Sequence, residues 1–449
     1  MPRYTHMPTR RRFRLPPVGD APGTTSALPP AEPQVALLTG GGDRPYALGL
    51  AGSLIAEGVT FDFIGSDYLE SRELRECPQV RFVNLRGDAN PSAPLVTKVA
   101  RIARYYARLL RYAATARPRV FHILWNNKLE LLDRTLLLLY YRCLRKRIVF
   151  TVHNVNAGKR DRVDSALNRL TLRIQYRLVD HLFVHTQQMK QELRDDFGVA
   201  DSKISVIPFG INDTVPNTAL TGMEARRRLG LADSDKVVLF FGNIAPYKGL
   251  EYLIEAMAAI AGRLPECRLV IAGRPKGSES YWAAIEARIS LLQLGPRIVQ
   301  RIEYVPDGDT EVYFKAADVL ALPYTHVFQS GVLFLGYNFG LPVVASDVAS
   351  FKEDIIEGTT GFVCAARDAA ALAQAIERFF ASDLYGSQPV RAAIRRFASE
   401  RYSWTTVGCI TREIYQAVVA APSSLNPAAS GRRMSGTAAE RAKDCSPET

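Results

Sequence analysis

The segment 329–332, Gln-Ser-Gly-Val, has a composition suited to binding phosphate. It follows the apolar run 319–323 and precedes a stretch typical of a helix. Backbone N–H groups at a helix start have no partner within the helix and carry the positive end of its dipole. A glycine lets a ligand approach the backbone, and a serine can donate its hydroxyl. The residues of this segment predicted to bind a diphosphate are Gln329, Ser330, Gly331 and Val332.

Two cations follow other apolar runs. Lys248 lies in a segment that opens at Gly242, where the run 237–242 ends, and Arg274 directly follows the run 268–273. A lysine ammonium is a suitable point charge for a phosphate cluster, and a guanidinium can contact two phosphate oxygens at once. A lone surface cation is usually only solvated, but the position at a strand end favours a phosphate role. We predict that both cations bind phosphate.

The first apolar run of the chain ends in a glycine triplet. Gly41 and Gly42 would let the backbone approach a phosphate or a sugar, and Asp43 and Arg44 come next as candidate acceptor contacts. A dinucleotide fingerprint would need an acid after the following strand, whereas Asp62 lies within that strand. The glycines are therefore predicted to belong to a diphosphate site, with a tight strand-to-helix turn as the alternative.

Polar side chains also end two further runs. His153 and Asn154 follow one of them, so they would point into a cleft at the carboxyl edge of a sheet. His122 and Trp125, with Asn126, end another run and are candidates for contacting an acceptor sugar. A ring can stack on a sugar and amides can bind its hydroxyls. The alternative for His153 is a histidine satisfied by neighbouring backbone, and the motif around His122 is unspecific.

Short apolar runs that alternate with helical patterns must position these side chains. Runs of this kind are typical of parallel strands buried on both faces, with helices as right-handed crossovers. The pattern starts again near residue 237, so the fold class is α/β with two Rossmann-like domains and a ligand cleft at the carboxyl ends of their strands. The predicted strands are 35–39, 61–65, 80–84, 120–124, 148–153, 181–185 and 204–207, then 237–242, 268–273, 303–305, 319–323 and 342–345.

The domain boundaries follow from changes in composition. Residues 1–33 and 422–449 lack apolar periodicity and are predicted to be disordered tails. Between them we expect an N-terminal domain over 34–217, a C-terminal domain over 218–404, and a last helix over 405–421.

Taken together, the segments 242–249 and 329–332 and the Gly-Leu-Pro at 340–342 resemble the donor site of family-4 retaining glycosyltransferases with the GT-B fold. These are group 1 glycosyl transferases of surface polysaccharide biosynthesis. The resemblance covers about residues 34–420. It implies two domains that face each other across a cleft, with the last helix crossing back to the first domain.

The resemblance also implies roles for individual residues. His153 would contact the transferred sugar and, with Lys248 and Arg274, forms the predicted catalytic set. The leaving phosphate would itself accept the proton of the acceptor, which gives retention of configuration without a protein nucleophile. Asp307 and Asp309 could hold a metal, but they precede a helical pattern where acids act as caps. We therefore expect no obligatory metal and no cofactor beyond the substrate nucleotide-sugar.

One departure from the family pattern affects nucleotide recognition. Many family-4 enzymes carry two glutamates eight residues apart, and the matching positions here are Val327 and Leu335. A subset of cell-surface polysaccharide transferases carries Gln-Ser-Gly-Val instead, as this chain does. The missing acids support one alternative, a catalytically silent sugar- or nucleotide-binding subunit. A second alternative is a nucleotide-sugar 2-epimerase on the same fold, which would need acid–base carboxylates that the sequence does not place in the cleft.

Charge and composition narrow the possible partners. The 449 residues carry a net charge of +12, and six cysteines are scattered without paired spacing, which indicates a reducing compartment. No aromatic–basic RNA motif or zinc-finger spacing appears, so nucleic acid is not expected as a partner. The sequence contains no apolar run long enough for a transmembrane helix, and no secretory signal is evident.

A basic amphipathic helix is predicted over 98–111, with cations at every third or fourth position. It is either a solvated outer helix or a contact with an anionic membrane surface. We therefore expect a cytoplasmic enzyme, peripheral at the inner face of the membrane, that moves a sugar from a nucleotide-sugar donor to a glycan or lipid-linked acceptor.

Overall fold

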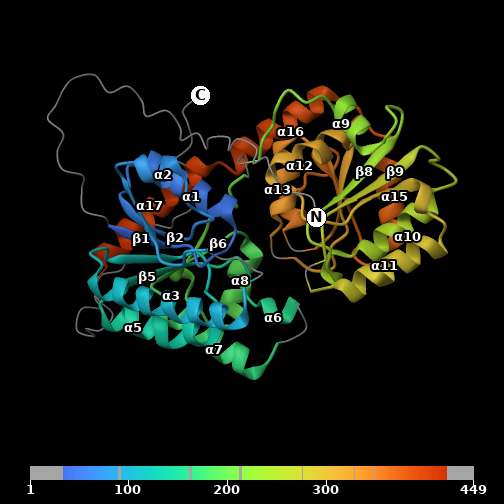
Figure 1. Cartoon of the computed structure of the whole chain (residues 1–449). Coiled ribbons are helices and arrows are strands. Elements are labelled where there is room, and N and C mark those ends of the chain that lie inside the picture. Colours follow the sequence, from blue (N-terminus) through green and yellow to red (C-terminus); the bar gives the residue numbers. More distant parts are fainter. Residues whose placement is uncertain are drawn as a thin grey trace, which may run out of the picture. The chain divides into compact units, whose positions relative to one another are not determined.

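The computed structural model describes residues 34–88, 93–160, 164–211, 215–275, 277–327, 329–348 and 350–421. The two tails predicted at 1–33 and 422–449 lie outside these residues. The described chain forms two parallel α/β sheets, as the alternating apolar runs predict (Figure 1).

The first sheet has seven strands in the order β3-β2-β1-β4-β5-β6-β7. β1 lies in its centre and pairs in parallel with β2 and β4. The polar segments that follow β1, β4 and β5 therefore lie at one edge of the sheet. The strands are β1 (Val35–Leu38), β2 (Phe61–Gly65), β3 (Val80–Asn84), β4 (Val120–Ile123), β5 (Arg147–Thr151), β6 (His181–Val184) and β7 (Ile204–Val206).

The second sheet has six strands in the order β10-β9-β8-β11-β12-β13, and every neighbouring pair is parallel. Both of its faces are buried, because alternate residues of one strand enter two separate apolar clusters. Val237 and Leu239 belong to one cluster, Val238 and Phe240 to the other. The strands are β8 (Lys236–Phe241), β9 (Cys267–Ala272), β10 (Ile298–Arg301), β11 (Val319–Leu322), β12 (Val343–Ser346) and β13 (Gly361–Cys364).

Helices cover both faces of each sheet (Figure 1). The helices up to residue 195 are α1 (Arg44–Ala56), α2 (Arg72–Glu76), α3 (Leu95–Thr115), α4 (Glu130–Leu132), α5 (Leu138–Cys143), α6 (Ala157–Arg160), α7 (Ala166–Leu178) and α8 (Gln187–Asp195). The later ones are α9 (Gly222–Leu229), α10 (Leu250–Ile260), α11 (Glu279–Leu291), α12 (Asp307–Ala316), α13 (Gly331–Asn338), α14 (Phe351–Asp354), α15 (Ala369–Phe380), α16 (Gln388–Arg401) and α17 (Trp404–Ala420).

Contacts divide the chain into two compact units. The first contains the described residues up to Thr151, Ile174–Leu182 and those from Val407 onward, and the second contains Val152–Arg173 and Phe183–Thr406. Most of α17 belongs to the first unit. Its Tyr415 hydroxyl lies 2.6 Å from His122 of β4.

Two predictions about the second sheet were wrong. No strand forms at 303–305, because β10 lies earlier, at Ile298–Arg301, and β13 at Gly361–Cys364 was not predicted. Both are the outermost strands of the sheet, so polar residues are tolerated in them and the continuous apolar signal is lost. No helix in the described part of the chain is long and apolar enough to cross a bilayer.

Candidate functional site

Lys248 is a buried cation at the carboxyl edge of the second sheet. It ends the 3₁₀ turn Pro246–Lys248 that follows β8, and its side chain is only 5% exposed. Its ammonium donates to the Phe241 carbonyl (3.4 Å) and lies 5.2 Å from the centre of the Tyr324 ring. Burial lowers the pKa of Lys248. Among the described residues, no carboxylate lies within ion-pair distance of this lysine, so the site can accept an anion.

Two glycines keep the space around Lys248 open. Gly242 and Gly273 both have positive φ, of 96° and 150°. A Cβ at Gly242 would lie 3.0 Å from the Lys248 ammonium and 3.5 Å from Val332 Cγ2. A Cβ at Gly273 would lie 1.9 Å from the Gly242 carbonyl oxygen. Neither position accepts a side chain, so the backbone itself lines the space beside the lysine.

The segment from Gln329 to Val332 forms the start of α13, as predicted. Ser330 is the N-cap residue, and its side chain makes no capping hydrogen bond. Since no capping hydroxyl occupies the helix start, its first amides are available to an anion. Val332 is one of the two side chains that approach Gly242. The structure therefore brings this segment and Lys248 to the same place within the second unit.

Gln329 is oriented by a buried acid that the sequence did not single out. The Gln329 amide nitrogen donates to Asp354 Oδ2 (3.4 Å), while its Oε1 is buried without a hydrogen-bond partner. Asp354 also accepts from the Tyr402 hydroxyl (2.9 Å). Burial raises the pKa of Asp354 to about 6. The free amide oxygen can accept a hydroxyl proton from a ligand.

Arg274 follows β9, as predicted, in a loop beside that of Lys248. The Ile244 N–H donates to the Arg274 carbonyl (2.9 Å), which ties the two loops together. The guanidinium is exposed and lies 5.3 Å from the centre of the Tyr304 ring. Unlike Lys248, Arg274 is therefore a solvated cation at the rim.

His153 is part of an aromatic cluster in the second unit. Its ring lies 5.1 Å from that of His185 and 6.2 Å from that of Phe209. Phe209 stacks on Phe334 of α13 at 5.4 Å and approaches Gly331, where a Cβ would lie 3.9 Å from the ring. One chain of aromatic contacts thus connects His153 with the start of α13. Asn154 is exposed and points outside this cluster.

The two histidines are in hydrogen-bond contact. His185 Nδ1 lies 3.3 Å from the Ile207 carbonyl, and its Nε2 lies 3.3 Å from His153 Nδ1. Burial lowers the pKa of His185 to about 4, so its ring is neutral at neutral pH. Since a carbonyl only accepts, the His185 proton is on Nδ1, and its Nε2 must accept from His153 Nδ1. This leaves His153 Nε2 as the atom that can face a substrate.

The glycine loop after β1 lies in the first unit and is tightly packed. A Cβ at Gly42 would lie 2.0 Å from the Trp125 ring, and one at Gly41 would lie 2.0 Å from the Arg86 guanidinium. Arg86 donates to the Gly40 carbonyl (2.8 Å) and lies 4.7 Å from the centre of the Tyr105 ring. Arg86 is thus a cation beside the glycine loop that sequence reasoning missed.

Other residues predicted to contact the acceptor are held by the fold itself. His122 is fully buried, and its ring nitrogens lie 2.6 Å from the Tyr415 hydroxyl and 2.8 Å from that of Thr151. Burial lowers the pKa of His122 to about 3. Both ring nitrogens are engaged by the fold in this conformation, so the structure gives no support to the acceptor contact predicted for His122. Asn126 exchanges hydrogen bonds with Gln175.

Asp43 and Arg44 begin α1. Asp43 is its N-cap residue and accepts from the Tyr46 N–H (3.1 Å). Arg44 donates to the Tyr68 carbonyl (3.1 Å). Trp125 is half-buried, and its ring meets that of Tyr46 edge-on at 5.7 Å. All three therefore make contacts within the fold, whether or not they also contact an acceptor.

Asp307 and Asp309 lie in the first turn of α12, where the helix dipole favours acids. The N-cap residue is Pro306, so these acids stabilise the helix start from within the helix rather than by capping it. Among the described residues, no group of three or more metal-binding side chains is present.

Two family models match successive parts of the chain. The model described as "Glycosyltransferase Family 4" matches residues 40–215, and "Glycosyl transferases group 1" matches residues 235–382. The two matches fall on the two sheets. They include the glycine loop, His153 and the segments around Lys248 and Gly331.

Similar curated proteins include glycosyltransferases with different acceptors. A glycogen synthase of Mycobacterium tuberculosis is 29% identical over 276 residues, 60% of this chain, and the match spans only 63% of that relative. A D-inositol 3-phosphate glycosyltransferase of Corynebacterium glutamicum is 25% identical over 393 residues, 85% of this chain and 92% of the relative.

Solved structures share the fold. Sucrose-phosphate synthase from Thermosynechococcus elongatus has a TM-score of 0.68 at 21% identity, covering 87% of this chain and all of the other. Anabaena HepE in complex with UDP-glucose has a TM-score of 0.66 at 17% identity, covering 85% of this chain and 99% of the other. At these identities, the likeness concerns the two-sheet architecture.

Proposed function

This chain belongs to the retaining glycosyltransferases of family 4, the group 1 glycosyl transferases with the GT-B fold, and from this we propose its substrates and the residues that act on them. It transfers a sugar from a nucleotide-sugar donor. Its acceptor is a glycan or a lipid-linked intermediate of surface polysaccharide biosynthesis.

The observation that carries the donor site is the buried ammonium of Lys248. A buried cation without an acid beside it is unfavourable unless an anion binds there. The donor diphosphate supplies that anion, with Lys248 on one side and the amides of Gly331 and Val332 on the other. Arg274 at the rim adds a second cation, and the amide oxygen of Gln329 accepts a sugar hydroxyl.

The reaction breaks the bond between the anomeric carbon and the leaving phosphate oxygen and forms a bond to the acceptor oxygen. Negative charge develops on the leaving phosphate, and Lys248 stabilises it in a largely water-free environment. The leaving phosphate oxygen takes the proton of the acceptor hydroxyl on the same face, so configuration is retained. No protein nucleophile is required.

His153 contacts the transferred sugar through Nε2. His185 holds His153 Nδ1 as a donor, and Nε2 is the nitrogen that accepts a sugar hydroxyl proton. In the first unit, Gly41 and Gly42 let the backbone approach a donor phosphate, and Arg86 and Trp125 contact the acceptor.

The donor proposal is tested by a panel of UDP-, GDP-, dTDP- and ADP-sugars, with UDP-glucose first because the solved neighbour HepE binds it. We expect the nucleotide-sugars of one base to raise the melting temperature. The protein should also hydrolyse them slowly to the free sugar and the nucleoside diphosphate. Lys248→Met should abolish both effects, whereas Lys128→Met, which removes an exposed lysine, should change neither. Binding without turnover toward any acceptor would contradict the transferase proposal.

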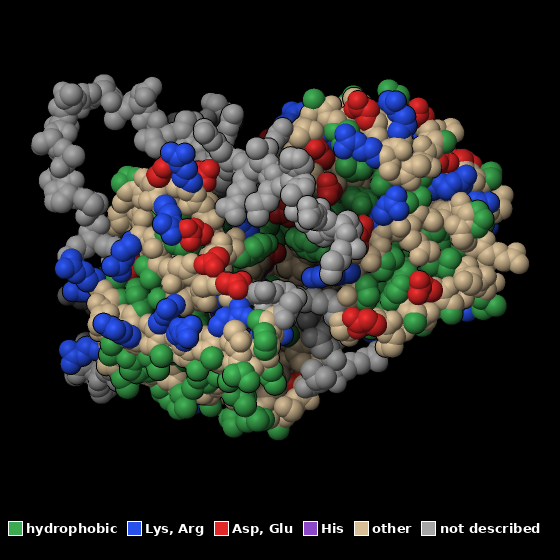
Figure 2. All heavy atoms as spheres, viewed as in Figure 1, with side chains coloured by type: hydrophobic (Ala, Val, Ile, Leu, Met, Phe, Trp, Pro, Cys, Tyr) green, Lys and Arg blue, Asp and Glu red, His purple; other side chains and the backbone are tan. Residues whose placement is uncertain are grey.

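Access to a lipid-linked acceptor is proposed through α3 and α5. Three apolar side chains of α3 are largely exposed (Leu95, Val96 and Val99), as are Leu136 and Leu139 near α5. The Tyr140 hydroxyl of α5 donates to the Leu110 carbonyl of α3, so the two helices lie side by side. Figure 2 shows hydrophobic side chains gathered at the lower left over these helices, bordered by Lys and Arg.

This combination suits an anionic membrane surface, because the apolar side chains can enter the headgroup region while the cations bind lipid phosphates. Flotation with vesicles containing phosphatidylglycerol should capture the protein at low salt. Replacing Arg104, Arg108 and Arg111 with Gln should reduce capture about tenfold. Replacing Arg227, Arg228 and Arg396 instead removes the same charge elsewhere and should leave capture unchanged. Equal loss of vesicle capture in both triple variants would show that capture depends on net charge and not on the position of the arginines.

A further inference from the structure

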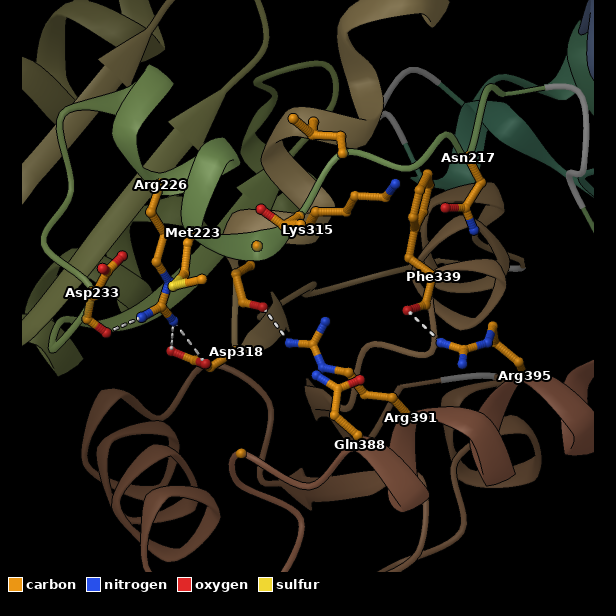
Figure 3. A pocket seen from close by; sticks show the side chains of 15 residues that line it. Asn217, Met223, Arg226, Asp233, Lys315, Asp318, Phe339, Gln388, Arg391 and Arg395 are labelled. Carbon is orange, nitrogen blue, oxygen red and sulfur yellow. Dashed lines mark hydrogen bonds and ion pairs between the residues drawn. The ribbon is translucent and has the colours of Figure 1, made fainter.

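A second cavity lies in the second unit, at the edge of the sheet opposite to Lys248. Its volume is about 410 Å³, and it is lined by residues of α9, α12 and α16 and of the segments around them (Figure 3). Asp318, which directly precedes β11, lies in its wall, whereas Tyr324 and Lys248 follow the other ends of β11 and β8. The cavity is therefore separate from the proposed donor site.

The lining of this cavity carries more positive than negative charge. Arg226 pairs with both oxygens of Asp318 (2.9 and 2.8 Å), and Lys315 pairs with Glu311 (3.0 Å), so these charges are balanced. Asp233 adds one carboxylate at the rim, and its backbone carbonyl accepts from Arg226 (2.6 Å).

Arg391 and Arg395 are not balanced in this way. Arg391 donates to the Ala317 carbonyl (2.5 Å), and Arg395 donates to the Phe339 carbonyl (3.4 Å). Across the described residues, neither has a carboxylate within ion-pair distance. Each guanidinium has five N–H groups, so most of its donors are left to face the cavity, toward which Figure 3 shows Arg391 pointing.

The two arginines also repel each other. They lie four residues apart on α16, a spacing at which like charges are destabilising. Burial lowers the pKa of Arg391, the Asp318 carboxylate partly opposes this shift, and the charges of Arg226 and Arg395 add to it. An anion between the two guanidinium groups would remove this repulsion.

Two helix starts reinforce the positive potential. Thr221 and Gly222 at the start of α9 line the cavity, and so does Gln388, the first residue of α16. The positive ends of two helix dipoles therefore point to the same space as the arginines. Phe339 and Met223 supply apolar surface for the rest of a ligand.

We propose that this cavity binds a small phosphorylated compound, with its phosphate held by Arg391 and Arg395. The volume fits a ligand the size of a sugar phosphate, at the lower end of the range for small-molecule sites. The inference does not depend on the proposed donor or acceptor, because it uses none of their residues.

The test uses the full-length protein and inorganic phosphate as the probe, with chloride at matched ionic strength as the reference. Phosphate should raise the melting temperature and bind with measurable heat. Arg395→Gln should weaken binding at least tenfold without affecting the fold, because this side chain is exposed. Arg391→Gln should weaken binding as much, although loss of its contact with Ala317 also makes this variant less stable.

Two comparisons decide whether phosphate binds at this cavity. Arg396→Gln removes an exposed charge from the same helix outside the cavity and should bind phosphate as the unmodified protein does. Lys248→Met removes any phosphate binding at the proposed donor site and should keep the binding at the cavity. Adding Arg395→Gln to Lys248→Met should therefore still weaken phosphate binding at least tenfold. No further loss on adding Arg395→Gln, or no binding left in Lys248→Met, would overturn the cavity proposal.

Discussion

His185 Nε2 lies 3.3 Å from His153 Nδ1, and the opposite nitrogen of His185 lies at the same distance from the Ile207 carbonyl. The carbonyl fixes the proton of His185, and His185 in turn fixes that of His153. A backbone oxygen of one loop thus decides which nitrogen the proposed catalytic histidine presents.

Removing the acceptor at position 185 should therefore lower kcat rather than weaken donor binding. His185→Phe should reduce kcat about tenfold with KM for the donor changed less than twofold, because His153 is no longer held in one tautomer. His185→Gln can still accept a hydrogen bond and should recover part of the loss. Steady-state kinetics of both variants, with circular dichroism to check the fold, measure this. Equal losses in the two variants would indicate a packing role only.

Replacing Lys248 should have opposite effects on stability and on activity. Lys248→Met should lower donor affinity about 100-fold, since a buried cation–phosphate contact is lost. Without donor, the variant should be more stable by about 1–2 kcal/mol, because a buried charge is removed. The pKa of Lys248 in the unmodified protein is lowered by burial, so its charged form destabilises the fold. This destabilisation decreases as pH rises toward about 10.4, the ordinary pKa of a lysine, because the buried ammonium then loses its proton.

Urea unfolding with and without the nucleoside diphosphate selected in the donor panel measures both effects of Lys248→Met. The gain in stability should be present without this ligand and reversed when the ligand is saturating. A variant that loses stability in both conditions would contradict the view that the ammonium lacks an internal counter-charge.

Gly273 should tolerate no side chain. Gly273→Ala places a Cβ 1.9 Å from the Gly242 carbonyl oxygen at a φ of 150°, so the loop beside Lys248 must move. We expect a loss of about 2–4 kcal/mol of unfolding free energy and loss of donor binding. Gly262→Ala is the matched control, because no atom lies within 4 Å of its Cβ. Chemical denaturation of both variants distinguishes local strain from a general effect of replacing glycine.

The contact between Gln329 and Asp354 predicts a pH-dependent defect. Gln329→Glu places a second carboxyl about 3.4 Å from Asp354, and two buried carboxylates so close cannot both ionise. The Asp354 pKa is already raised to about 6, so the protein holds a proton there that the unfolded chain releases near pH 4. The added carboxyl raises this pKa further, so the destabilisation should increase as pH rises above 6 and should decrease as pH falls toward 4.

Gln329→Met, which adds no charge, should lose a constant amount of stability across this range. Thermal melts of both variants between pH 4 and 8 provide the comparison. A defect of Gln329→Glu that is independent of pH would show that its carboxylate turns away from Asp354.

Much of the architecture could be predicted from the apolar runs alone. Strands buried on both faces, such as β8 and β11, have a continuous apolar signal, and both were placed within a residue or two. The outermost strands β10 and β13 have a weaker signal because solvent contact tolerates residues such as Gln300 and Arg301 in β10.

Fewer residues of the candidate site than strands of the fold could be predicted from their position in the sequence. The strand-end argument that selected His153 applies equally to His185, yet His185 was not selected because no motif surrounded it. The contacts of Asp354 and Arg86 depend on residues 25 and 46 positions away, and spacing cannot show such contacts. Val327 and Leu335, where many relatives carry glutamates, are both buried in an apolar cluster, so a glutamate there would have to be accommodated by repacking.

Helix α13 has one end in each of two proposed sites. Ser330 and Gly331 start it beside Lys248, and Phe339, at its other end, lines the cavity of Arg391 and Arg395. Eight helical residues span about 12 Å, so a shift of this helix on binding at one end would displace the residues at the other. If a ligand at one end changes the affinity at the other, its own affinity changes by the same factor. The level of a phosphorylated metabolite could then set the rate of sugar transfer without competing for the donor.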